Sequence, residues 1–208
     1  MKNIKPIDKS FWEERHNKSD LQWLAGTDMM PLLKYYNLLP TDLIGKSVME
    51  IGIGMGNALS EMSRLAWKSY AVDISDIALE RIKDKVTQTY QTSNLKYAPE
   101  CDIIICHLVF LHCTDEEVTR IINDAPLSKN GKMYFHFSGL KDNIVTEKVQ
   151  KLLIDNGTHF FRDYLDMQKL ILNTNKELTY ITEPVYGGEY YGNWLHHEWY
   201  FGILENKK

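Results

Sequence analysis

The sequence predicts an α/β fold in which a mostly parallel sheet carries helices on both faces and ends in an antiparallel hairpin. Between residues 46 and 140, short apolar runs alternate with stretches of helical periodicity, which is typical of parallel strands joined by helical crossovers. The run from Asp102 to Leu111 is apolar almost throughout, as a central strand buried on both faces requires. The end of the chain is rich in aromatic and β-forming residues, which favour paired strands.

The elements follow in order from the amino terminus. Residues 9–38 have the apolar spacing of two helices, and Pro40 and Gly45 then end the helical pattern. Further along the chain, we expect helices near residues 57–67, 75–87, 115–124, 143–156 and 164–173. Strands are expected at residues 47–51, 70–72, 101–109 and 132–137, and residues 178–185 and 197–204 form the terminal hairpin.

The length of 208 residues is enough for one substantial core and short for two ordinary domains. Neither an internal repeat nor a low-complexity linker marks a boundary, so we expect one domain over residues 1–208. It would comprise an N-terminal helical cap (1–40), a ligand-binding core (46–140) and a C-terminal substrate-side portion (141–208).

The composition argues against two classes of binding partner, nucleic acids and membranes. The formal net charge is −4, so no global basic field attracts phosphate backbones, and we do not expect nucleic acid as a partner. No stretch reaches the roughly 18 consecutive apolar residues that cross a bilayer, and residues 1–16 carry charges throughout, unlike a signal peptide. We therefore expect a cytoplasmic protein without a membrane partner.

The three cysteines, Cys101, Cys106 and Cys113, lie in one segment. An odd number does not form a disulfide framework, so we expect reduced thiols. With His107 and His112 nearby, the segment contains zinc-type ligands, but strand alternation places Cys101 and Cys106 on opposite faces, and the spacing fits no zinc finger or ribbon. We expect apolar packing here and no metal site.

The most informative segment is VMEIGIGMGNALSEM, residues 48–62, in which an apolar strand is followed by three glycines and a helix. Glycines at such a turn permit positive φ values and a close approach of the backbone to a ligand. The dinucleotide pattern G-x-G-x-x-G fails, because the sixth position is Asn57 counted from Gly52 and Leu59 counted from Gly54. A nicotinamide-dependent enzyme is therefore not expected.

The order acid-x-Gly-x-Gly-x-Gly instead resembles the first motif of class I S-adenosylmethionine (SAM)-dependent methyltransferases. The resemblance extends over residues 46–140 and implies a Rossmann-like, seven-stranded sheet with SAM as cofactor and S-adenosylhomocysteine (SAH) as product. In that family the acid helps to orient the loop and the methionine end of the cofactor. The implied cofactor-binding residues are Glu50, Gly52, Gly54 and Gly56.

Two later positions complete the expected cofactor site. The second strand ends at Asp73, whose carboxylate can accept both hydroxyls of a ribose diol, and the resemblance implies this role toward SAM. The alternative is a helix N-cap, which Ser75 can provide alone. Near the adenine the family usually has an acid, but residues 89–95 contain none, so Gln91, Thr92 or Ser93 fills the place, and Ser93 is the residue that we predict.

The segment CHLVFLHCTDEEV, residues 106–118, resembles the family's fourth-strand segment, in which an apolar strand ends in a histidine-bearing turn. The resemblance implies that residues 106–108 line the SAM pocket, with His107 and Leu108 as cofactor contacts. His112 is the leading candidate for a general base, because open α/β sheets bind ligands at the carboxyl ends of their strands. The alternative is a histidine packed on the following helix.

The final strand offers a second candidate base. His197 lies at its start, beside His196 and Glu198. The surrounding residues 186–201, rich in glycine and aromatic side chains, would either contact the substrate or pack within the sheet. His136 is expected to pack within its own strand.

Methyl transfer from a sulfonium requires alignment of the reacting atoms and exclusion of water, and a base only when the acceptor is a hydroxyl. Neither the aspartate of magnesium-dependent catechol-type enzymes nor the Pro-Pro-aromatic motif of nucleic-acid amino methyltransferases occurs after the fourth strand, where the chain reads HLVF. We predict methylation of oxygen or nitrogen on a small molecule, such as a sugar or a nucleotide-sugar intermediate. The alternative is a catalytically silent partner subunit with the same fold.

Overall fold

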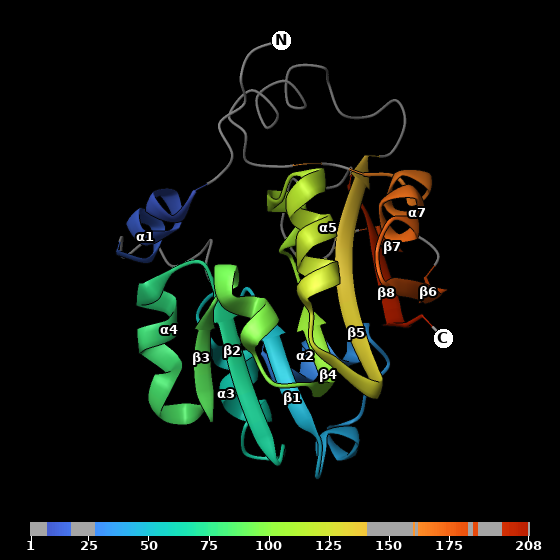
Figure 1. Ribbon diagram of the computed structural model, residues 1–208. Coiled ribbons are helices and arrows are strands. Elements are labelled where there is room, and N and C mark those ends of the chain that lie inside the picture. Colours follow the sequence, from blue (N-terminus) through green and yellow to red (C-terminus); the bar gives the residue numbers. More distant parts are fainter. Residues whose placement is uncertain are drawn as a thin grey trace.

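The computed structural model describes residues 8–17, 28–140, 160, 162–182, 185–186 and 197–207. Its centre is one sheet in which seven strands lie in the order β3-β2-β1-β4-β5-β8-β6, with the short β7 also paired to β8 (Figure 1). The strands are β1 (Ser47–Ile51), β2 (Lys68–Asp73), β3 (Gln88–Gln91), β4 (Cys101–Cys106), β5 (Leu127–Leu140), β6 (Lys176–Ile181), β7 (Val185–Tyr186) and β8 (His197–Asn206).

The pairing directions match the predicted fold class. Strands β1 to β5 pair in parallel, whereas β8 runs antiparallel to both β5 and β6. The predicted Rossmann-like α/β fold and its terminal antiparallel pair, β6 with β8, are confirmed. The strand order reverses between β1 and β4, the position at which open α/β sheets bind ligands beyond the carboxyl ends of their strands.

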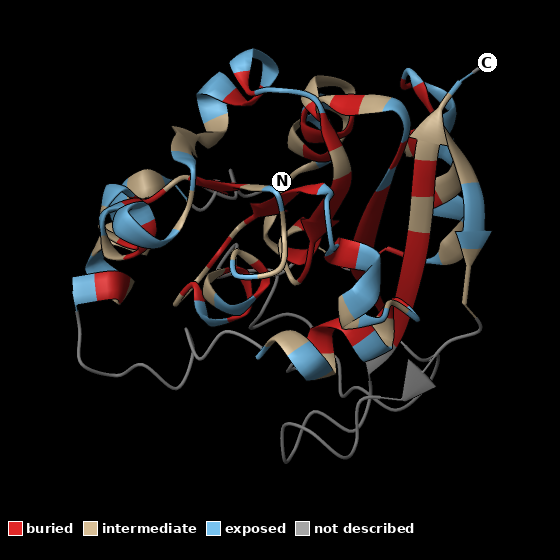
Figure 2. Cartoon of the chain, turned by 90° about the horizontal axis from the view of Figure 1, so that it is seen from below, coloured by how far each residue is buried: buried red, intermediate tan, exposed pale blue. Residues whose placement is uncertain are grey.

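Helices cover both faces of the sheet. The described α-helices are α1 (Lys9–Asn17), α2 (Met29–Tyr35), α3 (Asn57–Met62), α4 (Asp76–Ile82), α5 (Asp115–Asp124) and α7 (Tyr164–Leu172). Buried residues of α2, α3 and α4 form one core cluster with one face of the strands, and those of α5 and α7 form the other. Figure 2 shows the buried strands between helices that are exposed on their outer sides.

The central strands are buried on both faces, as the unbroken apolar runs predict. In β1, Val48 packs into the cluster with α2 and α3, and Met49 packs into the cluster with α5. In β4, Ile103 packs into the cluster with α2 and α3, and Ile104 packs into the cluster with α5. This two-sided burial fixes the register, because a slip of one residue would exchange the faces.

Several elements differ in length from their predictions. Strand β4 ends at Cys106 rather than at residue 109, because the chain turns at Leu108, which has a φ of 57°, and then forms the 3₁₀ turn Phe110–His112. Strand β5 is longer than residues 132–137, since β8 pairs with it as far as Leu140. The predicted helix at residues 143–156 lies outside the described residues.

Helix α5 begins where the sequence signal for a helix start is strongest. Thr114 and Glu117 form a capping box, in which each side chain accepts a hydrogen bond from the other residue's backbone N–H. Val118, Ile121 and Ile122 then form its buried face. The cap fixes the point at which the histidine-bearing turn enters the helix.

The described residues contain three free cysteines, no group of potential metal ligands and no helix long and apolar enough to cross a bilayer. Cys101 and Cys106 are buried, as expected. Burial raises the pKa of the Cys101 thiol to about 12, so this thiol remains protonated at neutral pH.

Candidate active site

The glycine loop joins β1 to α3 at the carboxyl edge of the sheet. Gly52, Gly54 and Gly56 have φ values of 76°, 54° and 77°, in the left-handed region that side chains disfavour. The Gly52 N–H donates to the Val72 carbonyl at 2.7 Å, and the Gly56 N–H donates to the Ile53 carbonyl at 2.7 Å. The turn therefore needs glycine for its conformation.

Space excludes a side chain at two of these positions as well. A Cβ at Gly52 would lie 2.2 Å from Val109 Cγ2, and one at Gly56 would lie 2.8 Å from Ile82 Cδ1. The turn after β4 thus contacts the glycine loop through Val109, a residue that sequence reasoning missed. Only the packing of two segments more than 50 residues apart distinguishes it from its apolar neighbours.

Two buried carboxyls lie at the carboxyl ends of the adjacent strands β1 and β2, Glu50 at 6% and Asp73 at 7% exposure. Burial, reinforced by the negative charge of Asp73, raises the pKa of Glu50 to about 8. Burial also raises the pKa of Asp73 to about 6, against the opposing effect of backbone hydrogen bonds. Glu50 Oε2 is buried without a hydrogen-bond partner among the described residues, so the pair is suited to a cationic ligand.

Asp73 also ties β2 to the glycine loop. Its Oδ1 accepts the Ser75 N–H at 2.9 Å, and backbone N–H groups of Ile53 and Gly54 hydrogen-bond to the carboxylate. The cap of α4 comes from Ser75, whose hydroxyl accepts the Ala78 N–H at 3.2 Å. Asp73 is therefore not needed as a helix cap, while its predicted role toward a ribose diol stays a prediction.

The end of β3 lies beside the end of β2, since Gln91 is the register partner of Asp73. The Gln91 amide hydrogen-bonds to the Asp76 carboxylate, and the Thr92 carbonyl accepts from Arg120 at 3.3 Å. Ser93, the predicted adenine contact, is exposed at the start of the following 3₁₀ turn. Gln91 is the last residue of β3, and Thr92 and Ser93 come directly after it. The roles of all three near an adenine stay predictions.

His107 lies in an aromatic cluster beneath α2. Its Nδ1 is hydrogen-bonded to the Tyr36 hydroxyl at 3.1 Å, and its ring stacks on Tyr35 with centroids 5.6 Å apart. Burial lowers the pKa of His107 to about 3, so the ring is neutral at physiological pH. Val109 of the same turn contacts the glycine loop at Gly52, and cofactor contacts by His107 and Leu108 stay predictions.

His112, the leading candidate base, lies in the 3₁₀ turn after β4 and is half-buried. The indole ring of Trp12 in α1 packs edge-on against the His112 imidazole, with centroids 5.0 Å apart. His112 thus follows the carboxyl end of β4. The N-terminal helix covers part of its imidazole through Trp12.

Helix α1 reaches the cofactor side of this edge as well. Lys9 forms an ion pair with Asp76 at the start of α4, and His16 Nδ1 lies 3.2 Å from the Arg81 guanidinium. Arg81 in turn donates to the Gly54 carbonyl at 3.5 Å. The helix thus contacts both α4, next to the glycine loop, and His112, while its role as a cap stays a prediction.

The second candidate base is less completely described. The backbone of His197 pairs with Leu140 at the start of β8, while its side chain and all of His196 lie outside the described residues. Trp199 and Phe201 are buried, so this part of residues 186–201 packs within the sheet. His136 is also buried, which confirms its predicted packing.

Residues 26–174 match the family model described as "Methyltransferase domain". The chain belongs to this family. Among curated proteins it is similar to phosphoethanolamine N-methyltransferase 1 of Zea mays, with 25% identity over 130 residues, covering 55% of this chain and 26% of the relative. It is also similar to tRNA N(3)-methylcytidine methyltransferase trm140 of Schizosaccharomyces pombe, with 27% identity over 184 residues, covering 81% of this chain and 54% of the relative. The chain thus spans about a quarter and about half of these two methyltransferases.

Solved structures share the methyltransferase fold. Magnesium protoporphyrin IX methyltransferase from Synechocystis, with bound SAH, aligns with a TM-score of 0.65 and 13% identity, covering 96% of this chain and 100% of that one. Phosphoethanolamine N-methyltransferase 2 of Haemonchus contortus, in complex with SAM, aligns with a TM-score of 0.68 and 15% identity, covering 96% and 60%. The family model confirms the predicted methyltransferase family, and the matched structures, which include complexes with the cofactor SAM and with SAH, confirm its fold.

The residues of this methyltransferase fit that cofactor on two independent observations. The loop has positive φ at Gly52, Gly54 and Gly56, a conformation that glycine adopts where a backbone approaches a ligand closely. The unpartnered Glu50 oxygen suits the cationic methionine end of SAM. Because one relative is named for tRNA, the expected exclusion of nucleic acid stays a prediction.

Proposed function

We propose that this methyltransferase moves a methyl group from SAM to an oxygen or nitrogen of a small molecule, with sugars and nucleotide sugars as the first acceptor class to test. The observation that carries the assignment of the site is the buried pair Glu50 and Asp73 beside the glycine loop, with pKa values raised to about 8 and about 6. Two buried acids without a cationic partner destabilise the free protein. A ligand with an ammonium and a sulfonium group relieves this cost.

Each residue of the cofactor site has a distinct task. Glu50 accepts from the ammonium at the methionine end, and the backbone of Gly52, Gly54 and Gly56 lies against the cofactor. Asp73 accepts from the ribose hydroxyls while it holds the loop through its backbone hydrogen bonds. The residues that follow β3, Ser93 among them, lie near the adenine, and His107 and Leu108 belong to the turn that closes the pocket together with Val109.

SAM supplies an activated methyl group, so the protein mainly aligns the acceptor with it and excludes water. His112 is the base that we assign for a hydroxyl acceptor, since it lies at the carboxyl edge under Trp12. An amine acceptor needs only to arrive deprotonated. His197 is the second candidate for the same role.

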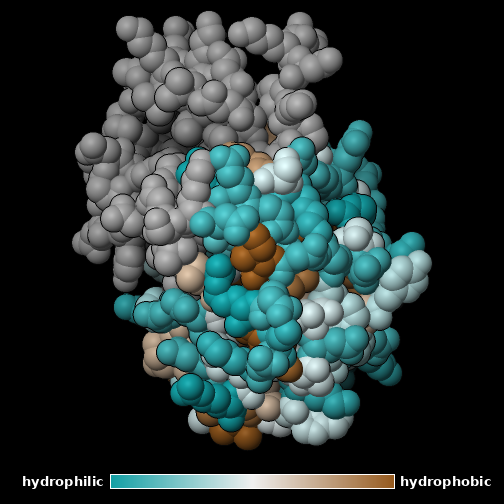
Figure 3. All heavy atoms as spheres, turned by 90° about the vertical axis from the view of Figure 1, so that its left-hand side faces the viewer, coloured by the Kyte–Doolittle hydropathy of each residue, from teal (hydrophilic) through white to brown (hydrophobic). Residues whose placement is uncertain are grey.

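A small acceptor is supported by charge and by one relative. The net charge is −4, and the face around α1, α4 and β3 is predominantly hydrophilic with separate small apolar areas (Figure 3). Polyanionic substrates bind instead to clustered basic side chains. The similarity to phosphoethanolamine N-methyltransferase 1 places a small amine in the acceptor panel, beside nucleotide sugars.

Two measurements test the proposal. Calorimetric titration with SAH should give saturable one-to-one binding, weakened in Glu50→Gln by on the order of tenfold or more through loss of a charged hydrogen bond. Glu100→Gln, which changes an exposed carboxyl before β4 in the same way, should bind as the parent does. Equal binding by all three proteins would remove Glu50 from the site.

Transfer of a radioactive methyl group from SAM is then measured with nucleotide sugars, phosphoethanolamine and unfractionated tRNA. The proposal expects turnover with a small molecule and none with tRNA. Turnover with tRNA alone would overturn the acceptor class. Binding of SAH without transfer to any acceptor favours the alternative, a catalytically silent partner subunit.

A further inference from the structure

A buried guanidinium lies next to the histidine-bearing turn, although sequence reasoning assigned it no role. Arg162 precedes α7 and is only 4% exposed. Its backbone N–H donates to the Ser138 carbonyl on β5 at 2.9 Å, which holds the residue against the sheet. A buried positive charge is costly unless hydrogen bonds satisfy it, so its partners define its role.

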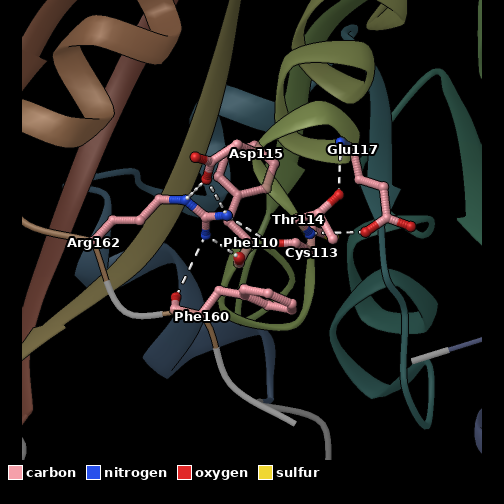
Figure 4. Close-up of polar contacts among 7 residues, drawn as sticks. All are labelled: Phe110, Cys113, Thr114, Asp115, Glu117, Phe160 and Arg162. Carbon is pink, nitrogen blue, oxygen red and sulfur yellow. Dashed lines mark hydrogen bonds and ion pairs between the residues drawn. The ribbon is translucent and has the colours of Figure 1, made fainter. Parts of the chain in front are cut away.

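The partners of the guanidinium include two backbone carbonyls at the histidine-bearing turn (Figure 4). Arg162 donates from Nη1 to the Phe110 carbonyl at 2.8 Å and from Nη2 to the Cys113 carbonyl at 2.6 Å. Nη1 also reaches the Phe160 carbonyl at 3.4 Å, and Nε donates to Asp115 Oδ1 at 2.8 Å. One planar group thus joins the start of the turn, its end and the first residue of α5.

These contacts hold the backbone on both sides of His112 in the sequence. The carbonyls of Phe110, the first residue of the turn, and of Cys113, the residue after it, accept from the guanidinium. The Phe160 N–H donates to the Leu111 carbonyl at 2.6 Å. The His112 N–H itself donates to the Val109 carbonyl at 2.8 Å. The backbone is therefore held on both sides of the histidine by the segment that includes Phe160 and Arg162.

The geometry specifically requires an arginine. A guanidinium presents donors in a rigid planar fork, whereas a lysine ammonium is a point charge that cannot reach separated acceptors at once. The ion pair with Asp115 contributes less than the carbonyls, because the Asp115 side chain is 70% exposed and such pairs are screened by water. The contacts that matter for the turn are those to Phe110 and Cys113.

We propose that Arg162 is the positioning residue for His112: its guanidinium fixes the turn so that the imidazole is held at the carboxyl edge of the sheet. The inference rests on the proposed function, in which His112 is the base. It predicts that loss of the fork moves the imidazole and has a smaller effect on the affinity for SAH, which falls only as far as the displaced turn disturbs the packing of Val109 on Gly52.

The test compares Arg162→Met, Arg162→Lys and, as the matched control, Asp115→Asn, which removes the ion pair and leaves the contacts with the carbonyls. Histidine-ring NMR signals are recorded with SAH bound, and the His112 signal is identified from His112→Ala. We expect Arg162→Met to shift or broaden the His112 signal, Arg162→Lys to do so partially, and Asp115→Asn to leave it unchanged. The affinity for SAH should fall by a smaller factor than kcat in Arg162→Met and Arg162→Lys, and should stay at the parental value in Asp115→Asn.

Turnover with the best hydroxyl acceptor of the panel gives a second readout, because only a hydroxyl needs the base. Arg162→Met should lower kcat by on the order of 10- to 100-fold, since small displacements of a catalytic group have effects of that size. In the His112→Ala background the same substitution should have no further effect, because both changes act through one group.

The inference is overturned if Arg162→Met and Arg162→Lys lose thermal stability but keep the parental His112 signal, or if the Arg162→Met effect on kcat multiplies with that of His112→Ala. If Arg162→Met does not fold, Arg162→Lys decides between the same outcomes. Failure of the proposed function looks different: His112→Ala then turns over as the parent does, whatever Arg162 contributes.

Discussion

Two regions of this methyltransferase bury an ionisable side chain, and the two side chains differ in whether the protein supplies their hydrogen-bond partners. Around the turn after β4, the guanidinium of Arg162 has hydrogen-bond acceptors from Phe110, Cys113 and Asp115 within 2.6 to 2.8 Å. Beside the glycine loop, Glu50 retains a buried oxygen without a partner among the described residues. The first region is complete within the protein, and we propose that a ligand completes the second.

The contrast distinguishes a buried side chain that stabilises the fold from one that we assign to ligand binding. A buried charge that the protein satisfies itself stabilises one arrangement, and its removal leaves several carbonyls unsatisfied. A buried acid with a pKa raised to about 8 destabilises the free protein at neutral pH, and its removal relieves that cost. Substitution of the buried ionisable group itself, Arg162 in one region and Glu50 in the other, should therefore change stability in opposite directions.

The largest effect is expected at Arg162. Arg162→Met should lower the free energy of unfolding by about 3 kcal/mol, because breaking a buried charged network leaves its partners unpaired. Asp115→Asn, at the exposed end of the same network, should change it by about 0.5 kcal/mol or less. Urea denaturation of both variants measures the difference, and a loss below about 1 kcal/mol in Arg162→Met would mean that the network is not the stabilising element described here.

The glycine loop should respond to added volume next. Gly52→Ala combines a left-handed φ with a Cβ 2.2 Å from Val109 Cγ2, so we expect a loss of about 2 kcal/mol in stability and of SAH binding. Gly45→Ala is the matched control, since Gly45 has a φ of 73° with nothing within 4 Å of the added Cβ, and it should lose about 1 kcal/mol without effect on binding.

Addition of Val109→Ala to Gly52→Ala sharpens this test. It removes the clashing methyl groups but not the strain in φ, so binding should return in part. Equal SAH affinities in Gly52→Ala and the parent, measured by calorimetry, would show that the loop does not need its close packing.

The opposite sign is expected at Glu50. Its pKa rises from 4.5 unfolded to about 8 folded, so its stabilising contribution is full below about pH 4.5 and is lost as the pH rises toward 8. Glu50→Gln does not ionise, and without ligand at pH 8 it should be more stable than the parent by on the order of 1 to 2 kcal/mol. Thermal unfolding at pH 5 and pH 8 measures the gain, and a variant less stable than the parent at pH 8 would contradict it.

The smallest effect is expected in the neutral cluster beneath α2. Tyr36→Phe removes the hydroxyl that is 3.1 Å from His107 Nδ1, which should lower stability by about 1 kcal/mol. Tyr97→Phe, at a position 71% exposed, is the control and should have no measurable effect. Chemical denaturation distinguishes the two, and identical midpoints would show that this buried bond contributes nothing.

The sequence predicted well those features that follow from local patterns. The apolar runs located β1 and β4 on the two-sided core, the glycine spacing located a loop whose glycines have positive φ, and the helical periodicity of residues 115–124 located α5. In each case one short segment contains the cause. The same reasoning placed His112 in the turn after β4, where the structure has it, while its role as a base stays a prediction.

Features that depend on distant contacts were not predictable in this way. Val109 contacts Gly52 only because two loops meet at the sheet edge, and Arg162 reaches Phe110 across 52 residues. The end of β4 at Cys106 was also missed, since an apolar run does not reveal that Leu108 will adopt a positive φ. An isolated arginine in a mixed segment has no local signature of burial.

The most direct test of the central claim is the number of protons released when SAH binds, measured by calorimetry at pH 7 in two buffers of different ionisation enthalpy. With a pKa of about 8, Glu50 is mostly protonated in the free protein and must ionise to bind the ammonium group. We predict release of about one proton by the parent and by Glu100→Gln, and close to none by Glu50→Gln, which should also bind more weakly. Binding with the same proton count and affinity in all three proteins would contradict the assignment of the buried acid pair to the cofactor.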